Sequence, residues 1–380
     1  MNITSFSYFV YFAIVGVQTT YLPNYYMKYH GFSGKHISLM FAGNMLFGVC
    51  SHVVWGQIAD RSRCSAALLR IGSICILIVY FLLSIINNIW IAALLFWSLG
   101  FFMTAMPALL DTITITNYPI KNYGNIRLWG SVGYGSAVLV IPFIIPKDYS
   151  PIFFITVLAF VYSIALIFIH EEKRENHTEI VKKIYILEIL KIPGLLPFLF
   201  FSLLHWCAHI SYNLCLDIHR DLLGLPFYVT GVAICTGICC EIFCMARISK
   251  WFEKINSYKV WFMIIATASA FRWSTMGYSL NISTFIAVQI FQGFTFGAFF
   301  TISVTYLRKV VPQDMLTSGQ NIFYITTFSL GGFIGTFLCG AMLDSVGKGF
   351  YVFLCSAVIS ILSLIQCLFL TDDVSASNSS

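Results

Sequence analysis

The sequence predicts an all-α membrane protein of twelve transmembrane helices in two pseudo-symmetric six-helix bundles. The observations behind this prediction are the apolar composition, the length of the apolar runs and the placement of basic residues. Of 380 residues, 58% are hydrophobic and 10% are charged, against about 25% charged in an average soluble domain. A bilayer solvates such a chain, and its runs are too continuous for the alternating strands of an outer-membrane barrel.

Twelve apolar runs are long enough to span a bilayer as helices, which takes about 18 residues. We place them at 5–27, 37–59, 66–86, 89–111, 126–146, 151–170, 195–218, 228–247, 258–280, 283–307, 318–343 and 350–370. The polar stretch His170–Lys183 separates six runs from six. We therefore expect bundles over 1–170 and 195–371, a cytoplasmic linker over 171–194 and a disordered tail over 372–380. The first run lacks a basic start and a cleavage site, so we interpret it as a membrane helix.

The basic residues predict an orientation. With both termini in the cytoplasm, the inner loops hold 16 Lys and Arg and the outer loops hold five, while Arg272 lies inside a helix. Lys and Arg favour the cytoplasmic side of a membrane. The bias supports twelve spans and two cytoplasmic termini, and we interpret the basic loops as orientation signals, not as a nucleic-acid surface.

The loop after the second run carries the motif GQIADRSR, residues 56–63. It resembles the G-x-L-A-D-R-x-G-R loop between helices 2 and 3 of the major facilitator superfamily. In such a loop a glycine allows close helix packing, a carboxylate faces a helix N-terminus and arginines hold the cytoplasmic position. The resemblance implies a gating and structural role for Gly56, Asp60, Arg61 and Arg63.

Further stretches resemble one group of that superfamily, the 3-phenylpropionate permeases, nucleoside:proton symporters and lactose permease-like proteins. YGNIRLWGSVGY (123–134) resembles Y-G-x-x-R-x-W-G-S-x-G, and QIFQGFTFG (289–297) resembles Q-x-L-H-G-x-T-F-G. MPALLDT, GICCEIF, AFRW and GAMLDSVG, which contain Asp111, Glu241, Arg272 and Asp344, resemble other motifs of the group. Gln292 stands where the group usually has His, so no titrating side chain occupies that position. The resemblance implies a major facilitator fold and transport.

Glu241 is the one residue in the run GICCEIFCM with a side chain that is charged near neutral pH in water. A charged side chain inside a spanning helix costs at least about 2.5–3.5 kcal/mol on insertion scales, so it usually faces a cavity or a partner. Removal from water favours the neutral form of a carboxyl, which suits a group that loads and releases protons. We predict that Glu241 couples transport to protons; the alternative is a carboxyl that ties helices together.

Arg272 lies inside the helix predicted over 258–280, between Phe271 and Trp273. Arginine stays charged, so it needs a counter-charge, an anionic solute or an aromatic face. We predict a role in coupling and substrate binding, with a scaffold ion pair as the alternative. The helical rise puts Arg272 about 20 Å and Glu241 about 10 Å from the cytoplasmic side, which leaves direct contact open.

Other residues are candidates for the solute site. Gln289 and Gln292 share a helical face, and they and Asn44 can hydrogen-bond a polar solute or tie helices together. Trp129 and Tyr25 suit stacking on a ring-bearing solute, or anchoring at the membrane interface.

Three remaining sets of charges and imidazoles have weaker functional signals. Asp111 and Arg127 are expected to pair at the cytoplasmic side, as a brace and gate or as a coupling pair. His205 and His209 are spaced i,i+4, which we interpret as a polar, cavity-facing or hydrogen-bonded pair and not as a zinc site, with His209 as a candidate to assist proton movement. Asp217 and Asp221, near the outer end of the seventh predicted span, are interpreted as interfacial.

These features predict a secondary active transporter that moves a small organic solute with protons by alternating access. The solute classes are aromatic or organic acids, nucleosides and sugars. No Walker loop or nucleophile cluster is evident, so ATP-driven transport and enzyme activity lack support. The expected partners are solute, proton and lipid, with no cofactor, metal or nucleic acid, for a monomer in a bacterial inner membrane. A proton-independent uniporter and a non-transporting sensor are the alternatives.

Overall fold

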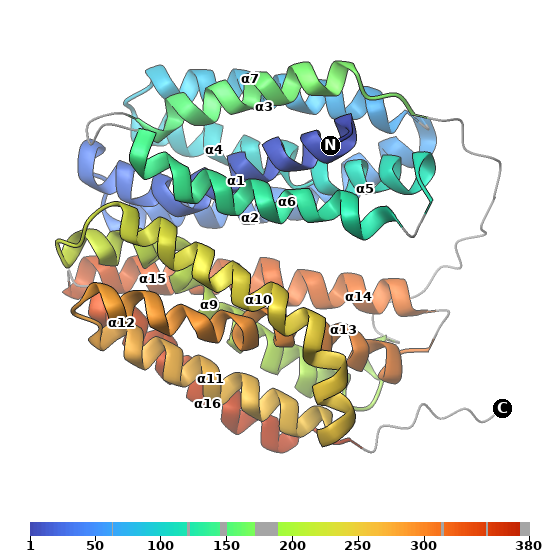
Figure 1. The fold of residues 1–380 in the computed structure, drawn as a ribbon, viewed down its shortest axis with the longest axis vertical. Coiled ribbons are helices and arrows are strands. Elements are labelled where there is room, and N and C mark those ends of the chain that lie inside the picture. The colour runs from blue at the N-terminus through green and yellow to red at the C-terminus, as the bar shows by residue number, and fades with distance from the viewer. Residues whose placement is uncertain are drawn as a thin grey trace. The chain divides into compact units, whose positions relative to one another are not determined.

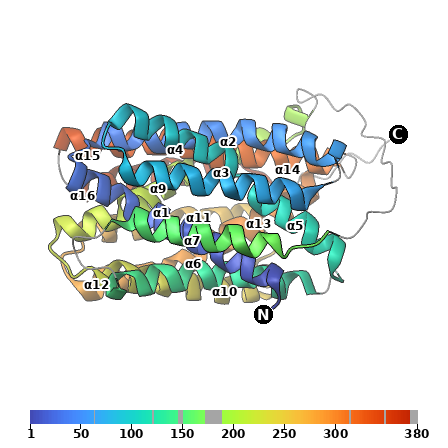
Figure 2. The same cartoon turned by 90° about the horizontal axis from the view of Figure 1, so that it is seen from above.

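The computed structural model describes residues 1–62, 64–119, 122–144, 150–171, 189–312, 315–346 and 349–372. Every regular element in these ranges is helical. Within each part of the molecule the helices run side by side in roughly one direction (Figures 1 and 2).

Seven helices of the described chain cover the first predicted bundle. They are α1 (Ile3–His30), α2 (Gly34–Ser62), α3 (Ser65–Ile85), α4 (Ile89–Met103), α5 (Met106–Asn117), α6 (Tyr123–Ile144) and α7 (Pro151–Ile167). The fourth predicted span is therefore broken between α4 and α5. Pro107 lies in the first turn of α5, and its ring excludes the carbonyl of the residue four positions earlier, so a continuous α-helix cannot run through it undisturbed.

The second half of the described chain contains six helical segments, some of which combine consecutive elements. Three of them are the single helices α9 (Leu195–Leu222), α10 (Tyr228–Ile255) and α11 (Tyr258–Tyr278). The fourth combines α12 (Ile282–Ala287), η2 (Val288–Phe291), η3 (Gly293–Ala298) and α13 (Phe299–Val310), and the fifth combines α14 (Leu316–Tyr324), η5 (Ile325–Gly331) and α15 (Gly332–Val346). The sixth is α16 (Gly349–Gln366), which is followed by η6 (Cys367–Phe369). In the described ranges the helices follow the twelve predicted spans in order, which confirms the predicted fold class.

The segments α12–α13 and α14–α15 depart from a regular α-helix, although the sequence predicted a single helix for each. η2 is a 3₁₀ turn, and η3 and η5 are π-helical. Glycines begin η3 and end η5, and glycine is a weak helix former. Such π segments are rare and frequently mark functional sites, so η3 directs attention to its neighbours.

The chain forms two compact units. The first comprises Met1–Thr178 and Asn213–Cys235, and the second comprises Glu179–Tyr212 and Thr236–Ser380. In the first unit α1 packs along α6, α2 along α4 and α3 along α7; in the second, α11 packs along α16. Small residues allow these close approaches. The predicted bundle limits, 1–170 and 195–371, stay a prediction.

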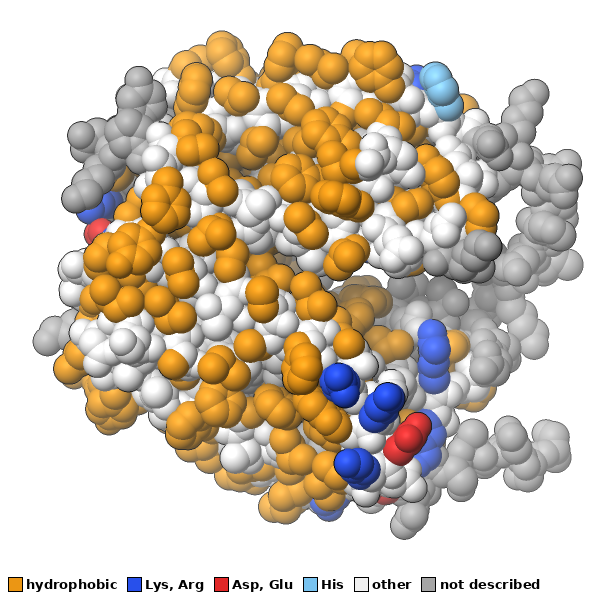
Figure 3. Space-filling view, in the orientation of Figure 1, with side chains coloured by type: hydrophobic (Ala, Val, Ile, Leu, Met, Phe, Trp, Pro, Cys, Tyr) orange, Lys and Arg blue, Asp and Glu red, His pale blue; other side chains and the backbone are white. Residues whose placement is uncertain are grey.

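Large apolar side chains cover most of the visible surface, and Lys and Arg gather near the end of the yellow helix α10 (Figure 3). Exposed Leu, Ile, Val and Phe occur along nearly every helix. Nine helices in the described residues are long and apolar enough to cross a membrane. This surface fits a bilayer, which solvates apolar side chains that water does not.

Part of the predicted gating motif lies outside the described residues. This holds for the burial of Gly56, for the side chains of Asp60 and Arg61 and for all of Arg63, so their gating role stays a prediction. Asp344 is described and lies exposed near the end of α15. Most of the predicted linker, 172–188, and of the predicted tail, 373–380, also lies outside the described residues.

Candidate functional site

Arg272 on α11 is the centre of a buried polar cluster in the second unit. Its side chain is 0% exposed. Its Nη1 donates hydrogen bonds to Oε1 of Gln292 and to Oγ1 of Thr295, the latter at 2.7 Å, and its Nη2 donates to Oε1 of Gln289 at 2.6 Å. The cluster therefore surrounds a buried cation with three neutral acceptors.

Two aromatic rings complete the surroundings of this guanidinium. Its carbon lies 4.5 Å from the ring centroid of Tyr212 and 4.4 Å from that of Trp273. A desolvated cation over an aromatic face gains about 2 kcal/mol or more. In the described part of the chain no carboxylate forms an ion pair with Arg272. Of the three environments predicted for Arg272, the structure supplies the aromatic face.

The irregular helix explains why the three acceptors meet. Gln289 lies in η2, Gln292 follows it and Thr295 lies in η3. In a 3₁₀ turn, residues three apart are eclipsed, and the π turn that follows alters the register again. The sequence predicted the shared face of the two glutamines but missed Thr295. The signal for Thr295 is its place between Gly293 and Gly297 in a segment with poor α-helix propensity.

Glu241 on α10 approaches the same cluster from the other side. Its side chain is partly buried and lies close enough to the Gln292 side chain to interact with it, with a longer-range electrostatic interaction with Arg272. Two glycines of η3 allow the approach. A Cβ on Gly293 would come within 2.8 Å of the Cys240 carbonyl oxygen, and one on Gly297 within 3.1 Å of the Glu241 carbonyl oxygen. Gln292 therefore stands between Glu241 and Arg272.

The orientation of the Gln292 amide follows from its partners. Arg272 donates to Oε1 of Gln292, so the amide nitrogen of Gln292 is the group that can donate to Glu241. An ionised Glu241 accepts this bond. A protonated carboxyl keeps an acceptor oxygen, but its neutral acceptor forms a weaker bond than a carboxylate. Gln292 is thus positioned to relay the charge of Glu241 to the Arg272 cluster.

His205 on α9 contacts the backbone of the cluster and helps to hold it in place. Its Nε2 lies 2.8 Å from the Thr295 carbonyl oxygen, and its Nδ1 lies 3.4 Å from Oγ of Ser269. Because a carbonyl only accepts, Nε2 must carry the proton, and Nδ1 of the neutral ring accepts from the serine. His209, one turn along, stacks on Trp206 with ring centroids 4.8 Å apart. The predicted hydrogen-bonded role is therefore confirmed for His205, whereas His209 packs among aromatic rings.

Asp111 and Arg127 form the predicted pair in the first unit. Nε of Arg127 lies 3.9 Å from Oδ1 of Asp111, and both side chains are about one-third exposed. The Tyr8 hydroxyl also donates to Asp111, and the guanidinium lies 4.3 Å from the Phe12 ring centroid. The contacts join α1, α5 and α6, as the bracing interpretation requires.

The remaining solute candidates belong to the first unit, whereas the Arg272 cluster belongs to the second. The Asn44 amide nitrogen donates to the Phe96 carbonyl oxygen at 2.7 Å, which ties α2 to α4. The Tyr25 hydroxyl lies 3.2 Å from Nε2 of His30. Trp129 is 36% exposed. The solute roles of all three residues stay predictions.

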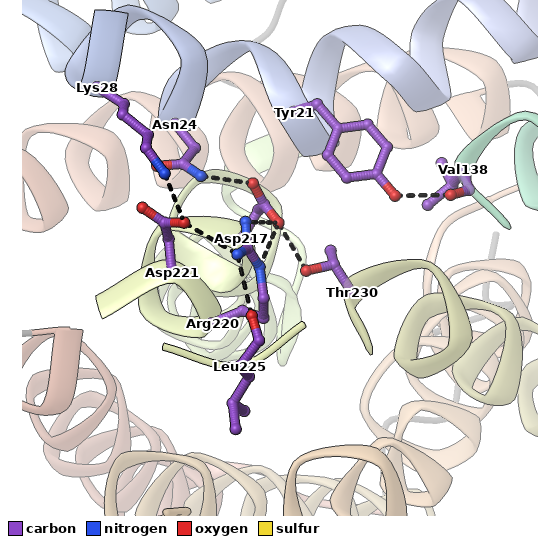
Figure 4. Close-up of polar contacts among 9 residues, drawn as sticks. All are labelled: Tyr21, Asn24, Lys28, Val138, Asp217, Arg220, Asp221, Leu225 and Thr230. Carbon is purple, nitrogen blue, oxygen red and sulfur yellow. Dashed lines mark hydrogen bonds and ion pairs between the residues drawn. The ribbon is translucent and has the colours of Figure 1, made fainter. Parts of the chain in front are cut away.

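Asp217 is the residue that the sequence interpretation placed wrongly, because its side chain is only 2% exposed. Its Oδ1 accepts from Nε and Nη2 of Arg220 at 3.1 and 3.0 Å and from Thr230 at 2.7 Å, and its Oδ2 accepts from Asn24 at 2.7 Å (Figure 4). All these residues belong to the first unit. Asp217 is therefore the centre of a second buried cluster, and it is not interfacial.

Comparison with known proteins identifies the class of this membrane protein. A family model described as the MFS_1 like family matches residues 2–355, nearly the whole chain. The chain therefore belongs to the MFS_1-like family, a transporter family with the major facilitator fold. The predicted superfamily is confirmed, and the protein is an integral membrane protein.

Individual relatives agree with this family. The uncharacterized transporter YwbF of Bacillus subtilis (strain 168) is 22% identical over 343 residues, which cover 90% of this chain and 86% of that protein. The crystal structure of the nucleoside transporter NupG has a TM-score of 0.86 at 16% identity, covering 97% of this chain and 98% of that chain. A bacterial homologue of the human lysosomal transporter Spinster, inward-facing and occupied, has a TM-score of 0.76 at 9% identity, covering 99% and 98%. The structural likenesses show a common fold.

Proposed function

We propose that this protein is a proton-coupled symporter that moves a small, neutral, ring-bearing solute by alternating access. The observation that carries the proposal is the connection of Glu241, through Gln292, to the buried Arg272. A partly buried carboxyl is the proton carrier that such coupling needs, and ionisable groups inside spanning segments commonly serve this purpose.

The coupling follows from the charges. An ionised Glu241 holds the Gln292 amide and offsets the charge of Arg272, whereas a protonated Glu241 binds the amide less tightly. Gln292 is then freer to turn toward a solute, and the acceptors of Arg272 rearrange with it. The proton thereby changes which hydrogen-bonding groups meet the solute, which links the two binding events.

The neighbours of Arg272 favour a neutral solute over an organic acid. Both terminal nitrogens of its guanidinium donate to Gln289, Gln292 or Thr295. A carboxylate would have to displace these bonds in a fully buried position. Amides suit hydroxyl and amino groups, and Tyr212 and Trp273 suit a ring. NupG is described as a nucleoside transporter, so nucleosides are the first solutes to test.

The test is uridine uptake into proteoliposomes with an imposed pH gradient, the acidic side outside. With one proton per solute, each pH unit supports about tenfold accumulation, because one unit equals about 1.4 kcal/mol. We expect Glu241→Gln to lose this accumulation yet still exchange labelled for unlabelled uridine. Glu253→Gln, on an exposed position of the same helix, is the matched control and should keep both activities.

Two outcomes would contradict the proposal. Accumulation by Glu241→Gln would show that another group carries the proton. Uptake that ignores the pH gradient in the unmodified protein would favour the uniporter, with Glu241 as a helix-tying carboxyl.

We also propose that the protein works without a cofactor or enzymatic step, as a monomer in a bacterial inner membrane with both termini in the cytoplasm. The distribution of Lys and Arg supports this orientation. Cysteine-directed labelling from either side of whole cells tests it, with a cysteine placed next to Lys28 expected outside.

A further inference from the structure

A cavity of about 590 Å³ lies in the first unit, where ends of α1, α6, α9 and α10 meet. Pockets for small organic ligands commonly measure about 300–1,000 Å³. Lys28 and Arg220 line it, and both belong to the residues that the charge pattern assigns to the outer side. Neither Glu241 nor Arg272 lines the cavity, so it is separate from the candidate coupling site.

Aromatic rings form much of the wall. Tyr21 and Phe227 pack edge to face with centroids 5.1 Å apart, and Phe143 stacks on Tyr228 at 6.3 Å with planes 20° apart. Tyr25 adds a further ring from α1. Aromatic faces and edges bind planar rings in stacked or edge-on arrangements. The wall therefore suits a flat ring.

The charged groups of the wall balance one another. Lys28 and Arg220 face Asp217 and Asp221, and all four take part in ion pairs (Figure 4). The pocket thus carries no net side-chain charge. Neither an anion nor a cation gains an uncompensated partner here, so the lining favours a neutral molecule.

One acceptor remains open in this network. Both oxygens of Asp217 are used, whereas Asp221 accepts from Lys28 at 3.1 Å and from Arg220 at 2.9 Å through Oδ1 alone. Among the described residues, Oδ2 of Asp221 accepts no hydrogen bond, and the side chain is 28% exposed. A ligand hydroxyl or amino group can donate to this oxygen without breaking an ion pair.

We propose that this cavity is a second solute site, which captures a neutral, ring-bearing molecule with hydroxyl or amino donors before it reaches the coupling site. The rings hold the flat part of the solute and Oδ2 of Asp221 holds a donor. The choice of nucleosides as the ligand class rests on the proposed function, whereas the site itself rests on the cavity, its rings and its balanced charges.

The test is equilibrium binding of tritiated uridine to the full-length protein in lipid nanodiscs. Phe143→Ala removes a ring without touching an ion pair, and we expect it to weaken one class of sites about tenfold, in line with base–aromatic stacking. Asp221→Asn should weaken the same class. Phe153→Ala is the matched control, because Phe153 is also exposed, on α7, and does not line the cavity. Uridine 5′-monophosphate should bind this class poorly, because its phosphate is charged.

A Gln292→Ala background isolates the two sites from each other. Binding that survives Gln292→Ala and is weakened by adding Phe143→Ala supports the second site, even if the protein fails to transport uridine. Isotherms that are unchanged by Phe143→Ala and by Asp221→Asn, or the absence of any uridine binding, would overturn it. Proton-driven uptake in the proteoliposome assay is judged separately, so failure of one proposal is distinguishable from failure of the other.

Discussion

In the part of the chain that the structure describes, two arginines are buried, and they are stabilised in different ways. Arg220 bonds to the carboxylates of Asp217 and Asp221, whereas Arg272 has neutral amide and hydroxyl acceptors and two aromatic rings. When adjacent carboxylates neutralise a charge, its stabilisation depends little on the ionisation of other groups. A charge held by neutral dipoles remains sensitive to the ionisation of a nearby group. The first arrangement suits a fixed structural element, and the second suits a responsive one.

Removing Asp217 should have the largest effect on stability. Asp217→Ala leaves Arg220 buried with its main partner gone, which costs about 3–5 kcal/mol for a buried pair. Denaturant unfolding in mixed micelles measures the change in the free energy of unfolding. Asp221→Ala, at a more exposed position with a half-exposed lysine partner, should cost about 1 kcal/mol or less.

A double variant tests the reason for this loss. Asp217→Ala combined with Arg220→Met should be more stable than Asp217→Ala alone, because the stranded charge is gone. If the two losses simply add, Arg220 is stabilised by other groups, and the contrast between the two arginines is wrong.

Removing Arg272 should separate stability from transport. Arg272→Met strands no carboxylate partner, and we expect a loss of about 1–3 kcal/mol from the acceptors it leaves unsatisfied. Proton-driven uptake should nevertheless disappear, because the group that senses Glu241 is missing. Unfolding and uptake measured on the same preparation check both statements.

Arg272→Lys tests the geometry of the same cluster. It keeps the charge but replaces a planar fork with a compact ammonium, so we expect uptake to fall although the charge persists. Full uptake by either variant would make Arg272 a scaffold residue.

The sequence predicted the membrane helices well because long apolar runs are sufficient to define them. It also named Glu241, Gln292 and Arg272 as site candidates, but it left contact between Glu241 and Arg272 open and did not foresee a connection through Gln292. Tyr212 and Thr295 were missed because their approach depends on the register of a 3₁₀ and π segment, and apolar periodicity carries no information about that register.

The error at Asp217 has a different physical origin. Its position near the end of a span indicated an interface with water. In the structure it is covered by Asn24, which lies 193 residues earlier in the chain. Burial by a distant segment cannot be inferred from local spacing, and neither could the cavity beside it.

The smallest expected effect concerns Asn44, an amide of the same chemical type as Gln292 but with a backbone partner. Asn44→Ala removes the bond to the Phe96 carbonyl oxygen, and side-chain hydrogen bonds between membrane helices contribute about 0.6 kcal/mol on average. We expect a small loss of stability and unchanged uridine uptake. The same unfolding and uptake assays measure both. A large fall in uptake at unchanged stability would instead return Asn44 to the solute site, and would mean that an amide bonded to a helix carbonyl also responds to the solute.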